Sequence, residues 1–104
     1  MSLVIARQTF QGPFSGTSSL EDRSGVYVIV TRRNSSEKYT VVDVGESATV
    51  KTRVSNHDRS GCWSQNNLDE LKVAVYYTPN LGQFGRKEIE QEIRRQYSPA
   101  CGDQ

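Results

Sequence analysis

Hydrophobic and polar residues follow patterns along this chain that predict its strands. Three short runs are rich in valine and tyrosine: 25–33, 39–45 and 71–77. Runs of β-branched and aromatic residues, bounded by glycine or polar turns, are typical of β-strands. Alternate residues of a strand face the same side, so one side of the last run is expected to carry Leu71, Val73, Val75 and Tyr77. The short polar connection between the first two runs predicts an antiparallel hairpin.

Two other segments have the spacing of helices. In residues 86–97, Ile89, Ile93 and Tyr97 recur every four residues and form one apolar stripe. A serine and a proline follow this segment and are expected to end the helix. Residues 46–59 predict the other helix, in which an arginine and a histidine one turn apart share a face.

The segment before residue 25 is weakly patterned. Its opening residues predict a short edge strand, and the stretch FQGPFSGTSS predicts a loop. From residue 25 onward the order is strand, strand, helix, strand, helix. This order predicts an α+β fold with a small three-stranded, mainly antiparallel sheet flanked by helices. We expect a single domain over 1–104, with its core in about 24–102 and an N-terminal extension over 1–23.

Charge and hydropathy limit the partners and the cellular location that we expect for this protein. Among 104 residues, 13 lysines and arginines oppose 12 acidic residues, for a formal net charge of +1. Binding to nucleic acid would therefore depend on a local basic patch. No apolar run reaches the roughly 20 residues of a membrane helix. We expect no membrane partner, no small-molecule cofactor and a cytoplasmic location.

The two cysteines, Cys62 and Cys101, are far apart in the sequence, and His57 is the single histidine. This composition does not predict a zinc site. No secretory signal precedes them, so we expect free, reduced thiols. A disulfide remains the alternative.

Glu90 lies at the rim of the apolar stripe on the last helix, close to Tyr97 on the helical wheel. One interpretation is structural: Arg86 and Arg94, one turn away on either side, pair with its carboxylate. The other is functional, because a carboxylate at the edge of a cleft can hold a divalent cation.

Four segments in order carry a family resemblance: GVY, DVG, VKTRVSNH and IEQEIRRQYSP. Their order and spacing resemble the GIY-YIG nuclease superfamily over about residues 24–102. The residues at the family's site positions are Tyr27, Asp43, Arg53, His57 and Glu90. The chain departs from the family at Asp43, where the second signature has a tyrosine, and at Gly102, where an asparagine is frequent.

The resemblance implies a metal-dependent endonuclease that hydrolyses DNA phosphodiester bonds with one Mg²⁺ or Mn²⁺. In that scheme Glu90 binds the metal, Tyr27 is the base or relays a proton, and Arg53 steadies the phosphate. His57 would be a general base or a phosphate contact, or else a cap at the end of its helix. The alternative is a catalytically degenerate domain that binds nucleic acid or a protein partner. A chain without a second DNA-binding module could also act as a homo-oligomer.

Asp43 interrupts a strand of valines and has three interpretations. It could be a replacement general base, or a second metal ligand beside Glu90. It could also mark lost catalysis and simply pair with Arg53.

Two further features allow a functional or a structural interpretation. Trp63 could stack on a nucleobase, or cover the small core. The expected tip of the hairpin carries Arg32, Arg33 and Lys38, which are either solvated charges or phosphate contacts.

Overall fold

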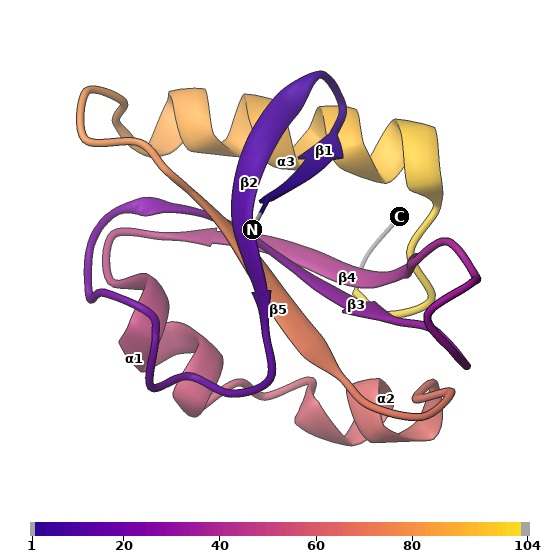
Figure 1. The fold of residues 1–104 in the computed structure, drawn as a ribbon. Coiled ribbons are helices and arrows are strands. Elements are labelled where there is room, and N and C mark those ends of the chain that lie inside the picture. The colour runs from indigo at the N-terminus through magenta and orange to yellow at the C-terminus, as the bar shows by residue number, and fades with distance from the viewer. Residues whose placement is uncertain (1, 103–104) are drawn as a thin grey trace.

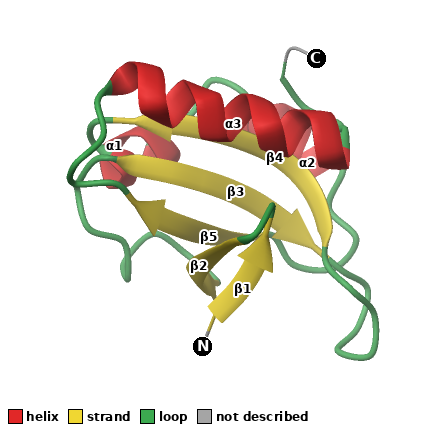
Figure 2. Ribbon diagram, turned by 90° about the horizontal axis from the view of Figure 1, so that it is seen from above, coloured by secondary structure: helices red, strands yellow, loops and turns green. Residues whose placement is uncertain are grey.

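The computed structural model describes residues 2–102, which form one sheet between helices on its two sides (Figure 1). The strands are β1 (Ser2–Ile5), β2 (Gln8–Phe14), β3 (Gly25–Thr31), β4 (Thr40–Ser47) and β5 (Lys72–Tyr77). The helices are α1 (Val50–Ser55), α2 (Ser60–Gln65) and α3 (Gln83–Tyr97). Figure 2 looks down on α3, with the sheet beneath it. None of the helices within residues 2–102 is both long and apolar enough to cross a membrane.

Within the described residues the sheet has five strands in the order β1-β2-β5-β3-β4, and every neighbouring pair is antiparallel. The fold is α+β, but the prediction of a three-stranded sheet is wrong. The three predicted strands are present as β3, β4 and β5. At the N-terminus, β1 confirms the expected short edge strand. Strand β2 pairs with β5 and extends the sheet, and it includes residues 10–14, so the prediction of a loop over FQGPFSGTSS is wrong there.

The β1–β2 hairpin lacks the usual sequence signals. Its two-residue turn consists of Ala6 and Arg7, which both have positive φ, 49° and 68°. Turns of this kind normally carry asparagine and glycine. The following strand contains Pro13, and the β2–β5 register shifts between Gln11 and Phe14. A proline can occupy a strand at such an irregularity, because the ladder there needs no N–H.

Two apolar clusters cover the two faces of the sheet. On the α3 side, the alternate β3 residues Val26, Val28 and Val30 lie in one cluster with Ile93 of the helix. On the other side, Ile29 and Tyr27 pack with the short helices through Val50, Val54 and Trp63. The valines and the isoleucine of β3 are buried on both faces, as expected for a central strand.

The predicted helix over 46–59 is wrong at both ends. Strand β4 continues to Ser47, and within residues 46–59 only α1, Val50–Ser55, is helical. Helix α2 begins at Ser60, beyond the predicted helix. The first turn of α1 receives its cap from a distant residue, because Asp22 accepts hydrogen bonds from the backbone N–H and the hydroxyl of Thr52. Asn56 leaves helical geometry, so His57 lies in the connection between the helices.

Candidate functional site

Tyr27 lies at the centre of the site, and a glycine makes room for it. It is on β3, directly opposite Gly45 on β4. A Cβ atom at Gly45 would overlap the hydroxyl and ring of Tyr27. The glycine of the DVG segment is therefore required by close packing of the phenol across the hairpin.

His57 contacts Tyr27 with a distance of 2.6 Å between Nε2 and the phenol oxygen. The other ring nitrogen, Nδ1, accepts a hydrogen bond of 3.0 Å from the backbone N–H of Arg59. Burial, together with the charges of nearby Arg53 and Arg59, lowers the pKa of His57 to about 4. The ring is therefore neutral near pH 7, and we assign the proton to Nε2, which donates to Tyr27.

Tyr27 keeps its own proton. Burial raises the pKa of its hydroxyl to about 12, although the charges of Arg53 and Arg59 act in the opposite direction. Since its oxygen accepts from His57, the phenol O–H is available to donate elsewhere. Arg53 also pairs with the exposed Asp58 at 3.0 Å, so two arginines and a hydroxyl donor lie near one another.

Asp43 is fully buried, and its carboxylate accepts hydrogen bonds from three side chains. Arg59 donates from Nε at 2.8 Å and from Nη2 at 3.3 Å, and the indole N–H of Trp63 donates at 2.7 Å. Arg94 donates from Nη2 at 3.2 Å, and the backbone N–H of Val44 donates at 2.8 Å. The carboxylate of Asp43 therefore connects β4 with α3 and with α2 and the residue that precedes it.

This arrangement selects among the interpretations of Asp43. The predicted partner, Arg53, pairs with Asp58, so that part of the prediction is wrong. Five donated hydrogen bonds occupy both carboxylate oxygens. A carboxylate so fully engaged has no lone pair directed at a water molecule or a metal ion.

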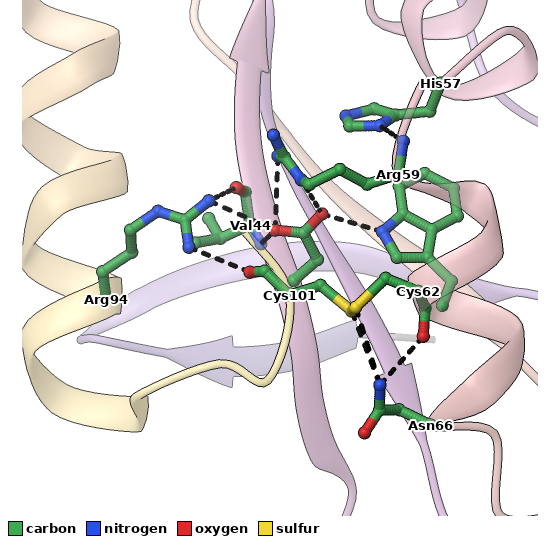
Figure 3. Close-up of a disulfide and its surroundings, with 9 residues drawn as sticks. Val44, His57, Arg59, Cys62, Asn66, Arg94 and Cys101 are labelled. Carbon is green, nitrogen blue, oxygen red and sulfur yellow. Dashed lines mark hydrogen bonds and ion pairs between the residues drawn. A yellow bond between two sulfur atoms is a disulfide. The ribbon is translucent and has the colours of Figure 1, made fainter. Parts of the chain in front are cut away.

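Arg94 and the C-terminal segment close the edge of β4. In Figure 3, Arg94 approaches from α3 and Arg59 from the opposite side, with the hydrogen bonds converging between them. Arg94 also donates to the carbonyl oxygens of Val44, at 2.6 Å, and Cys101, at 3.2 Å. The Cys101 N–H donates to the Val42 carbonyl at 2.9 Å. Backbone groups that would otherwise face outward from this edge strand are therefore paired.

Cys62 and Cys101 form a disulfide, so the prediction of free thiols is wrong (Figure 3). The bond joins α2 to the C-terminal segment, across a sequence separation of 39 residues. Gly102 follows with φ of 91°, and a Cβ there would lie 2.6 Å from Nη2 of Arg94. An asparagine at this position would displace the guanidinium, which accounts for the glycine.

Glu90 and Glu46 form a second, more accessible group of carboxylates. The Glu90 side chain is 17% exposed and accepts from Nε of Arg94 at 3.2 Å. Glu46 is 11% exposed and pairs with Nε of Arg86 at 2.9 Å. Of the two predicted partners of Glu90, Arg94 is therefore confirmed, whereas Arg86 contacts Glu46. Burial raises the pKa of Glu90; Arg94 opposes this, and Glu46 adds to it.

The donor set fits a divalent cation only in part. Residues 2–102 contain no group of three or more histidine, cysteine or acidic side chains that could hold a metal ion. Mg²⁺ in phosphate-processing sites usually takes one or two carboxylates, with water and substrate oxygens completing its shell. Glu90 and Glu46 meet that smaller requirement, and Asp43 does not contribute.

The structure also places Trp63 and the basic residues of the β3–β4 connection. Trp63 is buried in the core and donates to Asp43, which supports its structural interpretation. Arg32 stacks on the ring of Tyr39, and Arg33 pairs with Glu37. Lys38 lies in the same β3–β4 connection.

Sequence reasoning missed Arg59 and Glu46. Arg59 follows His57 by two residues, and Glu46 directly follows the DVG segment. Both are therefore close in the sequence to predicted site residues. Arg59 sat in the predicted helix, where i, i+2 neighbours face different sides. The break after α1 brings the two residues together.

The chain matches no protein-family model, no curated protein and no solved structure. The resemblance to GIY-YIG nucleases therefore stays a prediction. The class that fold and site define is an α+β domain with a buried tyrosine–histidine pair beside arginines and two partly exposed carboxylates.

Proposed function

We propose that this domain is a divergent GIY-YIG-type endonuclease that hydrolyses DNA phosphodiester bonds with Mg²⁺ or Mn²⁺. The observation that carries the proposal is the position of Arg59. It donates to Asp43 through its side chain and to His57 through its backbone, and His57 contacts Tyr27. Arg94 in turn joins Asp43 to Glu90, so these side chains form one connected group. A phosphate needs cationic and neutral donors, and a cation needs carboxylates.

The chain's own residues would bind and orient the phosphodiester. Arg53 would hold the phosphate oxygens through charge-assisted hydrogen bonds. Tyr27, with its pKa of about 12, would donate its proton to a phosphate or leaving-group oxygen rather than act as a phenolate base. His57 would hold the phenol in place through Nε2.

Glu90 and Glu46 are the residues that would hold the cation. A bound Mg²⁺ or Mn²⁺ supplies a water of lowered pKa and charge stabilisation for the phosphoryl oxygens. Burial raises the pKa of Glu90 although Arg94 lies beside it, and a bound cation would further stabilise the ionised form.

The test is cleavage of labelled DNAs (duplex, flap, junction and single strand) with Mg²⁺ or Mn²⁺, using the wild type and Glu90→Gln. We expect cleavage that requires the metal and is lost in the variant. Glu92→Gln is the matched control, since Glu92 lies on the same helix but pairs with the exposed Arg95. Undiminished cleavage by Glu90→Gln would refute the proposed role.

A second candidate is a non-catalytic domain that binds nucleic acid or a protein partner. It is favoured by the arginine partners of both Glu90 and Glu46, which already neutralise them without a metal. In that case, DNA binding would occur with no cleavage, and added Mn²⁺ would not bind.

The proposed cytoplasmic location has its own test. A disulfide such as Cys62–Cys101 is unusual in a reducing compartment. Alkylation of thiols in intact cells would distinguish free cysteines from a disulfide. Alkylated cysteines would support a cytoplasmic protein, and resistance until reductant is added would point to an oxidising compartment.

A further inference from the structure

We propose that Arg59 is a second phosphate-binding residue and that Asp43 is the positioning residue that presents it. This inference rests on the proposed function, because it concerns the phosphate of the same substrate. It also gives the buried aspartate of the DVG segment a role other than that of a base or a metal ligand.

The hydrogen bonds to Asp43 use only one edge of the Arg59 guanidinium. Nε and Nη2 of Arg59 donate to the two carboxylate oxygens, at 2.8 and 3.3 Å. Among the described residues, no hydrogen-bond partner is found for Nη1. The outer edge formed by Nη1 and the second proton of Nη2 therefore stays available. That edge can donate two parallel hydrogen bonds to a phosphate.

The backbone of Arg59 is held as well as its side chain. Its N–H donates to Nδ1 of His57, and the residue directly precedes the first turn of α2. Trp63 on α2 donates to the same carboxylate. With both ends fixed, little conformational freedom is lost when the guanidinium binds a ligand.

Exposure distinguishes Arg59 from the other arginine on this carboxylate. The Arg59 side chain is 28% exposed, whereas Arg94 is 6% exposed. Arg94 donates from Nε, Nη1 and Nη2 to groups of the chain itself. Arg59 is thus the member of the pair that can still reach a ligand.

The experiment is binding of a fluorescein-labelled single-stranded thymidine oligonucleotide, measured by anisotropy over a salt series in EDTA, where no metal supports hydrolysis. For single strands, each neutralised phosphate adds about 0.7 to the slope of log K against log salt. We expect Arg59→Gln to reduce that slope by about 0.7 and to weaken binding. Arg95→Gln, which removes an exposed, ion-paired charge on α3, is the control and should change the slope little.

Asp43→Asn supplies a readout with a decisive sign. Removal of a negative charge alone would strengthen binding to DNA, whereas loss of the positioning contact weakens it. We expect weaker binding, and also weaker binding for Arg59→Lys, which keeps the charge without the fork. Tighter binding by a folded Asp43→Asn would overturn the positioning role. If Asp43→Asn does not fold, wild-type affinity of Arg59→Lys for the oligonucleotide would overturn the positioning role instead.

The outcomes separate this inference from the proposed hydrolysis. A reduced slope for Arg59→Gln without any cleavage by the wild type would sustain the phosphate contact and refute the nuclease. Cleavage that depends on Glu90, with an unchanged slope for Arg59→Gln, would support the nuclease and refute the phosphate contact of Arg59. Failure of the wild type to bind the oligonucleotide at low salt would overturn the contact.

Discussion

Two groups of buried or partly buried carboxylates lie close together in this domain and differ in what surrounds them. Asp43 is fully buried, with two arginines, an indole and a backbone N–H on its two oxygens. We call Asp43, Arg59, Trp63 and Arg94 the closed cluster. Glu46 and Glu90 keep some exposure and have one arginine each, and we call these two residues the open pair.

The difference indicates how to assign roles to acidic residues in such a site. A carboxylate whose lone pairs are all occupied stabilises the fold, because removal of it leaves buried charges unpaired. A carboxylate with one partner and a raised pKa can exchange that partner for a ligand. Arg94 bonds to both groups and so couples their positions.

The largest expected effect comes from breaking the closed cluster. Asp43→Ala would leave Arg94 and the Trp63 N–H buried without their acceptor. We expect the free energy of unfolding to fall by about 4–5 kcal/mol. Urea denaturation measures this change. Asp69→Ala, on an exposed loop, should alter stability by less than about 0.5 kcal/mol, and an equal loss in both variants would contradict the comparison.

The disulfide comes next, since it ties the C-terminal segment over the closed cluster. Reduction with dithiothreitol, or Cys62→Ser, should lower the free energy of unfolding by about 3 kcal/mol. The same urea experiment, run with and without reductant, gives the value. Identical denaturation midpoints would show that Arg94 and the backbone contacts of Cys101 hold this segment without the bond.

A pH dependence isolates the tyrosine–histidine pair. The pKa of His57 is about 4 in the folded chain and 6.5 when unperturbed. Below pH 6.5 the unfolded chain takes up a proton that the folded chain does not. Stability is therefore complete above pH 6.5 and should fall by about 3 kcal/mol as pH decreases to 4.

His57→Gln should lose this slope, as thermal or urea unfolding at several pH values would reveal. The raised pKa of Glu90 has the opposite sign, because its contribution to stability declines as pH rises above 4.5. The wild type and His57→Gln both contain Glu90, so the difference between their pH profiles measures the contribution of His57 alone. Parallel profiles would mean that the pKa of His57 is the same in the folded and the unfolded chain.

The smallest effect on stability is expected in the open pair. Glu90→Gln removes a charge that burial already disfavours, and its bond to Arg94 is one of several made by that arginine. The free energy of unfolding should change by less than about 1 kcal/mol. Cleavage, by contrast, should be lost. A destabilisation comparable to that of Asp43→Ala would place Glu90 among the structural residues.

Periodicity predicted the elements that are long or strongly patterned. Strands β3, β4 and β5 and helix α3 lie within a few residues of their predicted bounds. The short strand β1 was predicted, but β2 was missed because its turn uses Ala6 and Arg7 rather than glycine or asparagine and because the strand itself contains glycine and proline. The end of α1 at Ser55 was missed because no proline or glycine follows it before Gly61.

The site was less predictable, because its geometry depends on long-range contacts. The link from Arg59 to Asp43 spans 16 residues and that from Arg94 to Asp43 spans 51. No local pattern reports such distances. The pairing of Cys62 with Cys101 likewise follows from the way the C-terminal segment passes over β4, and not from spacing.

The most direct test of the division between closed cluster and open pair is a calorimetric titration of Mn²⁺ into Asp43→Asn and Glu90→Gln. Asparagine keeps an acceptor for the Trp63 N–H, so this variant preserves more of the cluster than alanine does. We predict that Asp43→Asn, once shown to be folded, binds Mn²⁺ like the wild type and that Glu90→Gln does not. Loss of binding in Asp43→Asn, with binding retained in Glu90→Gln, would contradict the account.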